Sequence, residues 1–315
     1  MIVISEDVWS EEFAALSQRY PITHEVDLWN RIDDLKRHLA TAQALVVRNR
    51  TKVTRDLMDS APHLKVIARA GVGLDNIDLK AADESGIVVS AALGINAQAV
   101  AEHTLGLALA LSRDIVNRDS STRRGEWNRA AGHEISGKTW GFLGFGATAR
   151  ATSQLLAGFS MKQCAYDPFV NDGGAVSMMS FDQVISASDV ISIHLPATAE
   201  TTKIINTEVI SKMKKNAIVV SVGRGEVIDE VALESALRAG VIAGAALDVR
   251  EVEPAKDQRF TDLSNVILTP HIAGITVESQ AAINKVLVSE VEAALQGLPQ
   301  KYAVGSVQQI GRAHV

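Results

Sequence analysis

The chain has 315 residues, of which 47% are hydrophobic and 22% are charged. This composition excludes an intrinsically disordered chain, and the length predicts one large domain or two ordinary ones. The net charge is −6 and the densest basic cluster is Arg123–Arg124, which excludes a phosphate-binding stripe for nucleic acids. A single cysteine, Cys164, excludes a disulfide framework and a cysteine-built metal site. The first residues lack the basic start of a signal peptide, and no apolar run approaches the ~20 residues needed to cross a bilayer, so we expect a cytoplasmic protein.

Short apolar runs alternate with helix-like segments along the chain. Apolar runs without polar alternation are typical of strands buried on both faces, as in a parallel sheet covered by helices. The predicted strands are residues 2–4, 44–47, 66–68, 87–89, 140–145, 163–166, 190–194, 218–222, 243–249 and 266–268. Ten strands are many for one compact sheet, so the pattern predicts an α/β protein with two doubly wound parallel sheets.

The boundary between the two predicted domains lies near Ala97. A long helix is expected over residues 99–119, and its apolar surface predicts burial between other elements. A last long helix is expected over residues 277–296.

A glycine-rich turn follows the fifth predicted strand. The order strand, Gly144-x-Gly146-x-x-Ala149, helix is typical of a dinucleotide site: Gly144 permits the turn, Gly146 lets backbone approach a pyrophosphate, and Ala149 lets the helix pack closely. The N-terminus of that helix offers free N–H groups to the phosphates. Asp167 ends the next strand, where a carboxylate accepts ribose hydroxyls and repels a 2′-phosphate, which favours NAD over NADP. The alternative is a structural turn followed by a solvated aspartate.

Three charged or polar side chains follow later strands. Arg224, Glu253 and His271 are expected at the edge of the sheet that also carries Gly144 and Asp167, because the carboxyl ends of parallel strands share one edge. This set suits hydride transfer to a 2-oxo acid. Histidine supplies the proton, a neighbouring glutamate raises its pKa, and arginine binds a carboxylate. Singly, the histidine could cap a strand and the glutamate could be a solvated acid, whereas side-chain-poor glycines around Arg224 suit a ligand contact.

Several long segments, in a fixed order along the chain, carry a family resemblance that extends over residues 2–296. They are VVRNRTKVT from Val46, ARAGVGLDNID from Ala68, NAQAVAEHTLGLALAL from Asn96, GEWNRAAGHEISGKTWGFLGFG from Gly125, SVGRGEVIDEVALESAL from Ser221, ALDVREVEP and NVILTPHIAG. In these segments the chain resembles the D-isomer-specific 2-hydroxyacid dehydrogenases, in their phosphoglycerate-dehydrogenase-like branch without the regulatory domain.

The resemblance implies a split substrate domain, residues 1–97 plus 284–315, and an inserted Rossmann-like NAD-binding domain, residues 98–283, that forms a homodimer interface. It gives Arg224 the substrate carboxylate, His271 the role of general acid and base, and Glu253 the role of its partner. Asp248 resembles the residue that holds the nicotinamide amide. The cofactor contacts implied are Gly144, Gly146, Ala147, Thr148, Asp167, Val222, Gly223, Asp248 and Gly274. The substrate contacts implied are Arg48, Gly71, Val72 and Gly73, and no metal is expected.

The sequence departs from the family pattern at several positions. Ala147 and Thr148 stand where Arg-Ile is usual, Val72 replaces a hydroxyl residue, and Ser221 stands where Asn is frequent. Arg250 stands where Phe is frequent, and it either serves an anionic substrate or covers the surface.

Together these observations predict an NAD-dependent oxidoreductase acting on a small D-2-hydroxy acid. Arg48 and Arg129 are candidates for reading a second negative charge, as in 3-phosphoglycerate or 3-sulfolactate. If Arg48 is instead an ordinary surface arginine, hydroxypyruvate or glyoxylate reduction is the better prediction. A non-catalytic NAD-sensing scaffold remains as another class. A methyltransferase is the third, and it has no requirement for His271.

Overall fold

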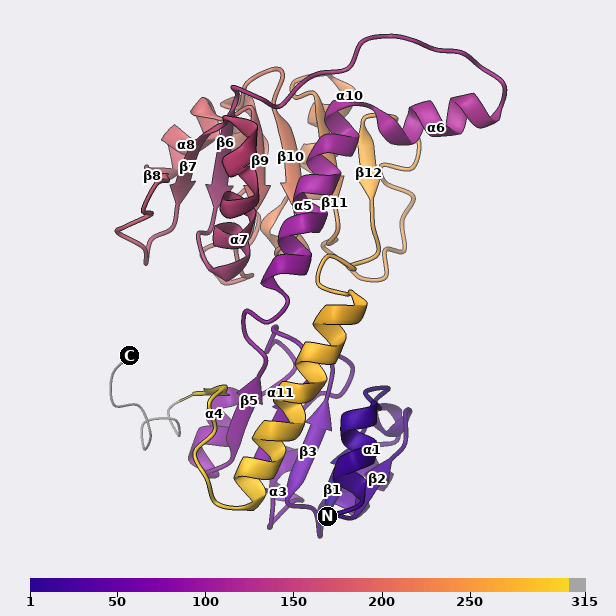
Figure 1. The fold of residues 1–315 in the computed structure, drawn as a ribbon, viewed down its shortest axis with the longest axis vertical. Helices are drawn as coiled ribbons and strands as arrows, with labels where there is room; N and C mark the ends of the chain where they lie inside the picture. The colour runs from indigo at the N-terminus through magenta and orange to yellow at the C-terminus, as the bar shows by residue number, and fades with distance from the viewer. Residues whose placement is uncertain (306–315) are drawn as a thin grey trace. The chain divides into compact units, whose positions relative to one another are not determined.

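The computed structural model describes residues 1–305, so the last ten residues of the predicted substrate domain, including 311–315, lie outside the described part. The chain forms two compact units (Figure 1). Unit 1 comprises Met1–Asn96 and the chain from Val277, and unit 2 comprises Ala97–Thr276. The second unit ends seven residues before the predicted position 283, because the last long helix starts at Val277 and is one uninterrupted element.

Unit 1 contains a six-stranded sheet in the order β13-β5-β4-β3-β1-β2. Only β13 runs antiparallel to its neighbour. The strands are β1 (Ile2–Ile4), β2 (Ile22–His24), β3 (Ala44–Val47), β4 (Val66–Arg69), β5 (Val88–Ala91) and β13 (Ala303–Val304). The helices are α1 (Glu11–Ser17), η1 (Leu28–Asn30), α2 (Ile32–Leu39), α3 (Arg55–Asp59), α4 (Leu79–Glu84) and α11 (Val277–Leu295).

Successive residues of a strand point to opposite faces, and both faces of this sheet are apolar. Ile2 and Ile4 pack with α1 and α11 on one face, whereas Val3 packs with α2, α3 and α4 on the other. This burial on both faces explains the apolar runs without alternation.

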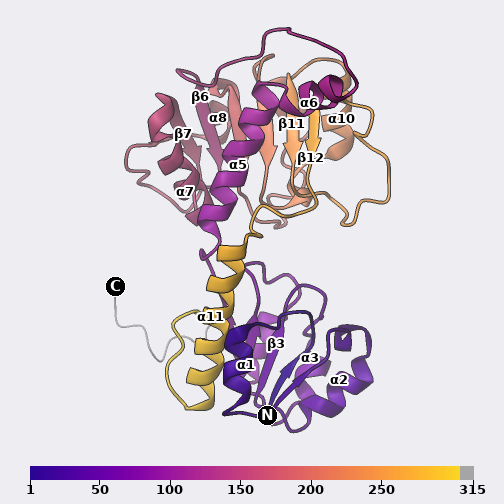
Figure 2. The same ribbon diagram turned by 45° about the vertical axis from the view of Figure 1, so that its right-hand side comes forward.

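Unit 2 contains a seven-stranded, fully parallel sheet in the order β12-β11-β10-β9-β6-β7-β8. The strands are β6 (Thr139–Leu143), β7 (Lys162–Tyr166), β8 (Ser177–Met178), β9 (Val190–Ile193), β10 (Ile218–Ser221), β11 (Gly244–Leu247) and β12 (Val266–Leu268). The helices are α5 (Ala97–Ser112), α6 (Ile115–Arg123), α7 (Ala147–Leu155), η2 (Leu156–Phe159), α8 (Phe181–Ala187), α9 (Thr207–Ser211), η3 (Gly225–Val227) and α10 (Glu230–Arg238). Helices α5 and α7 cover one face, with α5 in front of the sheet in Figure 2. Helices α8, α9 and α10 pack on the other face.

The predicted fold class is confirmed, since both sheets are α/β and nearly all parallel. All ten predicted strands are present, and three short strands were missed: β2, β8 and β13. Each lies at the edge of its sheet, where a strand is less buried and its apolar signal is weaker.

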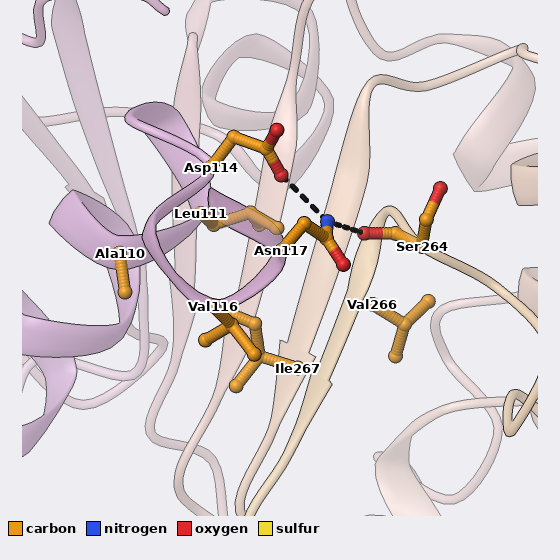
Figure 3. Close-up of a pocket in the computed structure, with 8 residues that line it drawn as sticks. All are labelled: Ala110, Leu111, Asp114, Val116, Asn117, Ser264, Val266 and Ile267. Carbon is orange, nitrogen blue, oxygen red and sulfur yellow. Dashed lines mark hydrogen bonds between the residues drawn. The ribbon is translucent and has the colours of Figure 1, made fainter. Parts of the chain in front are cut away.

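The prediction of one helix over residues 99–119 is wrong. The helix breaks after Ser112, and Asp114 adopts a left-handed conformation with φ 55°. Aspartate tolerates this region because its short polar side chain bonds locally. The Asn117 amide donates to the Asp114 carboxylate and to the Ser264 carbonyl, each at 2.6 Å, which ties α6 to the loop before β12 (Figure 3).

No helix within residues 1–305 combines the length and the apolar character needed to span a membrane.

Candidate active site

The glycine-rich turn joins β6 to α7 in unit 2. Gly144 has φ 83°, and a Cβ there would lie 3.1 Å from the His194 carbonyl carbon, so only glycine suits the position. Gly146 is the N-cap of α7 and supplies no side-chain cap, and a Cβ on it would meet nothing within 4 Å. Ala149 is completely buried, which fits its predicted packing role. The first-turn N–H groups of α7 are therefore free of a side-chain cap, and their predicted contact with a pyrophosphate stays a prediction.

Asp167 lies beside this turn. Its Oδ2 accepts a 2.8 Å hydrogen bond from the Phe145 N–H, and its Oδ1 accepts one of 2.9 Å from the Phe169 N–H. Ala147 and Thr148 are the first two residues of α7. The structure thus brings the predicted residues of the first βα turn together with the acidic residue at the end of β7.

His271 and Glu253 form a direct pair at the carboxyl edge of the same sheet. The Nδ1 atom of His271 lies 2.7 Å from Oε2 of Glu253, and Oε1 of Glu253 accepts a 3.0 Å hydrogen bond from the Arg250 N–H. The glutamate raises the pKa of His271 above its ordinary value, although burial acts in the opposite direction. Burial by itself would raise the pKa of Glu253, but the hydrogen bonds from His271 and the Arg250 N–H lower it below its usual range. The pair therefore favours an imidazolium beside a carboxylate.

Arg224 follows β10 and is half-buried. Its positive charge opposes protonation of His271, so the two side chains share one electrostatic environment. The flanking glycines have a reason different from the predicted one. A Cβ on Gly223 would lie 2.6 Å from the Leu195 carbonyl oxygen, and a Cβ on Gly225 would lie 2.0 Å from the Arg250 carbonyl carbon. Close packing of three loops requires both glycines. The predicted ligand contact of Arg224 stays a prediction.

Arg250 is engaged within the protein. Its Nε lies 2.8 Å from Oε1 of Glu230, its second terminal nitrogen lies 3.3 Å from Asp257, and its guanidinium lies over the Phe260 ring. These contacts engage the guanidinium, and only 12% of the side chain is exposed, so Arg250 does not cover the surface as the second alternative predicted. A contact with an anionic substrate stays a prediction.

Asp248 anchors the loop that carries His271. Its side chain is completely buried, and its two oxygens accept hydrogen bonds from Thr269 Oγ1 at 2.5 Å and from the N–H groups of Ile272 and Ala273 at 2.9 and 2.8 Å. Burial would raise the pKa of Asp248, but these donors and His103 lower it to about 2. The predicted contact of Asp248 with a nicotinamide amide stays a prediction.

His103 was missed by sequence reasoning. Its Nε2 lies 3.1 Å from Thr269 Oγ1 and 3.5 Å from Oδ1 of Asp248. The sequence offers one feature that could have identified it, since His103 is the one histidine in the apolar helix α5. Val222 and Gly223 lie in the loop after β10, and Gly274 lies in the loop after β12 that carries His271. Their contacts with a cofactor stay predictions.

The predicted substrate residues lie in unit 1. Arg48 follows β3, and the Glu6 carboxylate accepts hydrogen bonds from the backbone N–H groups of residues 48–51 at 2.8 to 3.2 Å. Burial would raise the pKa of Glu6, but these donors lower it below its ordinary value. Sequence reasoning missed Glu6, which fixes the turn that carries Arg48.

The turn after β4 contains Gly71, Val72 and Gly73. Gly71 has φ 143°, and a Cβ on it would overlap the Arg69 guanidinium, so this position also requires glycine. Arg48 and Ala70 line a cavity of about 230 Å³ within unit 1, together with Asp7, Val8, Trp9, Gln280 and Asn284.

Arg129, the other predicted anion-binding arginine, lies in an exposed segment of unit 2. Within residues 1–305, no group of three or more His, Cys, Asp or Glu side chains is arranged to hold a metal ion.

Residues 105–273 match the NAD binding domain of the D-isomer specific 2-hydroxyacid dehydrogenases. The chain belongs to this family. The predicted resemblance is therefore confirmed, and the predicted NAD site lies in the family's NAD binding domain.

Several members of the dehydrogenase family are similar over most of this chain. D-3-phosphoglycerate dehydrogenase of Archaeoglobus fulgidus is 39% identical over 96% of this chain and 59% of its own length, and that of Methanocaldococcus jannaschii is 43% identical over 84% and 52%. The chain thus spans about half the length of these curated relatives.

Solved structures of similar proteins agree with the fold. The TT0316 protein from Thermus thermophilus superposes with a TM-score of 0.90 and 30% identity, covering 96% of this chain and 99% of its own. An NADPH-dependent glyoxylate/hydroxypyruvate reductase from Sinorhizobium meliloti, solved with NADP and malonate, gives 0.87 and 26%, covering 100% and 99%.

Proposed function

We propose that this protein is an NAD-dependent oxidoreductase that interconverts a small D-2-hydroxy acid and its 2-oxo acid. The observation that carries the proposal is the His271–Glu253 pair, 2.7 Å apart, at the edge of the sheet that also holds the glycine-rich turn. The nicotinamide supplies or accepts the hydride when it is bound.

The chain's own residues supply binding and proton transfer. The raised pKa of His271 keeps the imidazolium available near neutral pH, so it gives a proton to the carbonyl oxygen during reduction and accepts one during oxidation. Arg224 binds the substrate carboxylate through paired hydrogen bonds. Glu253 holds the ring through Nδ1, which leaves Nε2 for the substrate.

We propose that the substrate carries a second anionic group that Arg48 binds, such as the phosphate of 3-phosphoglycerate or the sulfonate of 3-sulfolactate. Arg48 lines the cavity of unit 1, and within residues 1–305 no ion pair engages its guanidinium. The amides of Gln280 and Asn284 line the same cavity and offer hydrogen bonds to an oxyanion. The relatives named D-3-phosphoglycerate dehydrogenase support this choice.

A second candidate is reduction of hydroxypyruvate or glyoxylate. Asp7 lines the same cavity as Arg48, and its carboxylate repels a second negative charge. A neutral hydroxyl group avoids that repulsion.

We also propose a homodimer that acts in the cytoplasm, where reduced and oxidised NAD are exchanged between enzymes. Residues 122–134 are all exposed, and the Trp127 side chain in this segment is 80% exposed. Ile115 and Val116 of α6 are about half exposed. Such a set of apolar side chains marks an interaction surface, and a second copy of this chain covers it in the proposed dimer.

The test is loss of NADH absorbance with glyoxylate, hydroxypyruvate, 3-phosphohydroxypyruvate and 3-sulfopyruvate, with NADPH run beside it. We expect turnover with NADH, and replacement of His271 by Asn should lower kcat about a thousandfold without changing NADH binding. Unchanged turnover in that variant would disprove the mechanism. NADH binding without turnover on any of the four acids would favour the scaffold.

A further inference from the structure

A chain of polar side chains runs beneath the glycine-rich turn of unit 2. Trp140 lies on β6, Ser192 lies on β9, His194 follows β9, and Thr148 is the second residue of α7. Trp140 Nε1 lies 2.8 Å from Ser192 Oγ, which lies 3.1 Å from His194 Nε2. His194 Nδ1 lies 3.0 Å from Thr148 Oγ1. Residues of β6, of β9, of the loop after β9 and of α7 thus form one hydrogen-bonded series.

The chemistry of the groups sets the direction of donation. An indole N–H only donates, so Ser192 Oγ accepts from Trp140. Ser192 is completely buried, and its own hydrogen needs an acceptor. Within residues 1–305 that acceptor is His194 Nε2, which requires the hydrogen of the neutral ring on Nδ1. His194 therefore donates to Thr148 Oγ1.

The histidine stays neutral under physiological conditions. Burial lowers its pKa from 6.5 to about 3. Within residues 1–305 the ring contacts Thr148, Ser192 and the Phe142 ring, and no carboxylate pairs with it. The series thus ends at a hydroxyl whose oxygen already accepts from His194, and whose hydrogen has no acceptor in the described part of the chain. This hydroxyl lies in the first turn of α7, whose N–H groups have no side-chain cap.

We propose that Trp140, Ser192 and His194 are positioning residues that present the Thr148 hydroxyl as a hydrogen-bond donor to the pyrophosphate of the bound dinucleotide. This inference rests on the proposed NAD-dependent function. It explains how the turn binds phosphate although Ala147 stands where the family usually has Arg. A fixed neutral donor here replaces a mobile cation.

The inference is tested by measuring the Kd of NADH by fluorescence titration of the whole chain. Thr148→Val removes the hydroxyl at nearly constant volume and should weaken binding about tenfold or more, as expected for a lost bond to a charged acceptor. Thr148→Ser keeps the hydroxyl and should stay within about twofold of the original chain. Thr152→Val is the matched control, because its hydroxyl donates to the Thr148 carbonyl inside the same helix. Equal affinity of the Thr148→Val variant would overturn the inference.

A double-mutant cycle separates positioning from general packing. Ser192→Ala should weaken NADH binding about threefold in the original chain and should add nothing in the Thr148→Val background, because both changes remove the same donor. An equal loss in both backgrounds would show that Ser192 acts independently of Thr148, which contradicts the proposed positioning of Thr148 by the hydrogen-bonded series.

A second readout needs no cofactor. The ¹⁵N NMR signals of His194 should show the hydrogen on Nδ1 and no titration down to about pH 5. A hydrogen on Nε2 would make His194 donate to Ser192 and not to Thr148, which would overturn the inference. Failure of the original chain to bind NADH would disprove the proposed function and this inference together, whereas an unaffected Thr148→Val variant of a chain that binds NADH would disprove only the inference.

Discussion

Asp248 Oδ2 accepts a 2.8 Å hydrogen bond from the backbone N–H of Ala273, 25 residues further along the chain. The backbone N–H of His271 in turn donates to the Asp248 carbonyl oxygen at 2.8 Å. Asp248 therefore fixes the main chain of the proposed proton donor and of the two residues that follow it.

Replacement of Asp248 by Asn should destabilise the protein by about 2 kcal/mol at neutral pH. The folded pKa of about 2 lies below the ordinary 3.8, so the ionised carboxylate stabilises the fold above pH 3.8, and this contribution is lost as the pH falls towards 2. Acid unfolding followed by circular dichroism should show weaker pH dependence between pH 4 and 2 in the variant. The same dependence in both proteins would contradict the anchoring role.

Replacement of Glu253 by Gln should move the pH profile of oxoacid reduction. Glu253 raises the pKa of His271, so its removal lets the imidazolium lose its proton at lower pH, and the falling limb should shift to lower pH. At pH 8 we expect about a tenfold loss of kcat/KM. A uniform loss at all pH values, with no shift of the limb, would mean that Glu253 only orients the ring.

Replacement of Arg48 by Ala should lower kcat/KM for 3-phosphohydroxypyruvate about a hundredfold and for glyoxylate by less than about threefold, because only the former carries the distal charge. Arg50→Ala is the matched control: Arg50 belongs to the same turn but lies over the Trp29 ring. Equal losses on both acids would remove Arg48 from substrate recognition and favour the general reductase.

Replacement of Asp167 by Ser should raise the preference for NADPH over NADH at least about tenfold, since a carboxylate that repels a 2′-phosphate is removed. Asp172→Ser provides the control, because the Asp172 carboxylate accepts only a local bond from the Gly174 N–H. The ratio of kcat/KM for the two cofactors measures the effect. An unchanged ratio would assign Asp167 only to holding the Phe145 backbone.

Replacement of Trp127 by Ala should weaken the proposed dimer, because burial of this side chain contributes to association. Sedimentation velocity at micromolar concentration should show the shift towards monomer. Phe169→Ala removes another exposed aromatic, 92% exposed, and should leave association unchanged. A monomeric original chain would disprove the proposed dimer.

The sequence by itself determined the fold class and the positions of ten of the strands along the chain. Central strands such as β3 and β10 are buried on both faces, so their apolar runs can be recognised without knowing their partners. Glycine turns and residues at strand ends are likewise local features, which is why Gly144, Asp167 and His271 were found. The break at Asp114 was missed because no glycine or proline marks it in the sequence, while the compensating bonds come from Asn117 and the distant Ser264 carbonyl.

Only the tertiary structure decided what holds these groups in place. The Glu6 carboxylate meets the backbone of the Arg48 turn more than 40 residues away, and Asp248 meets His103 from another element. Likewise, Gly225 is glycine because the Arg250 backbone approaches it. Such contacts depend on which strands become neighbours in the sheet, and no local pattern encodes the hydrogen-bonding partner of a buried polar group.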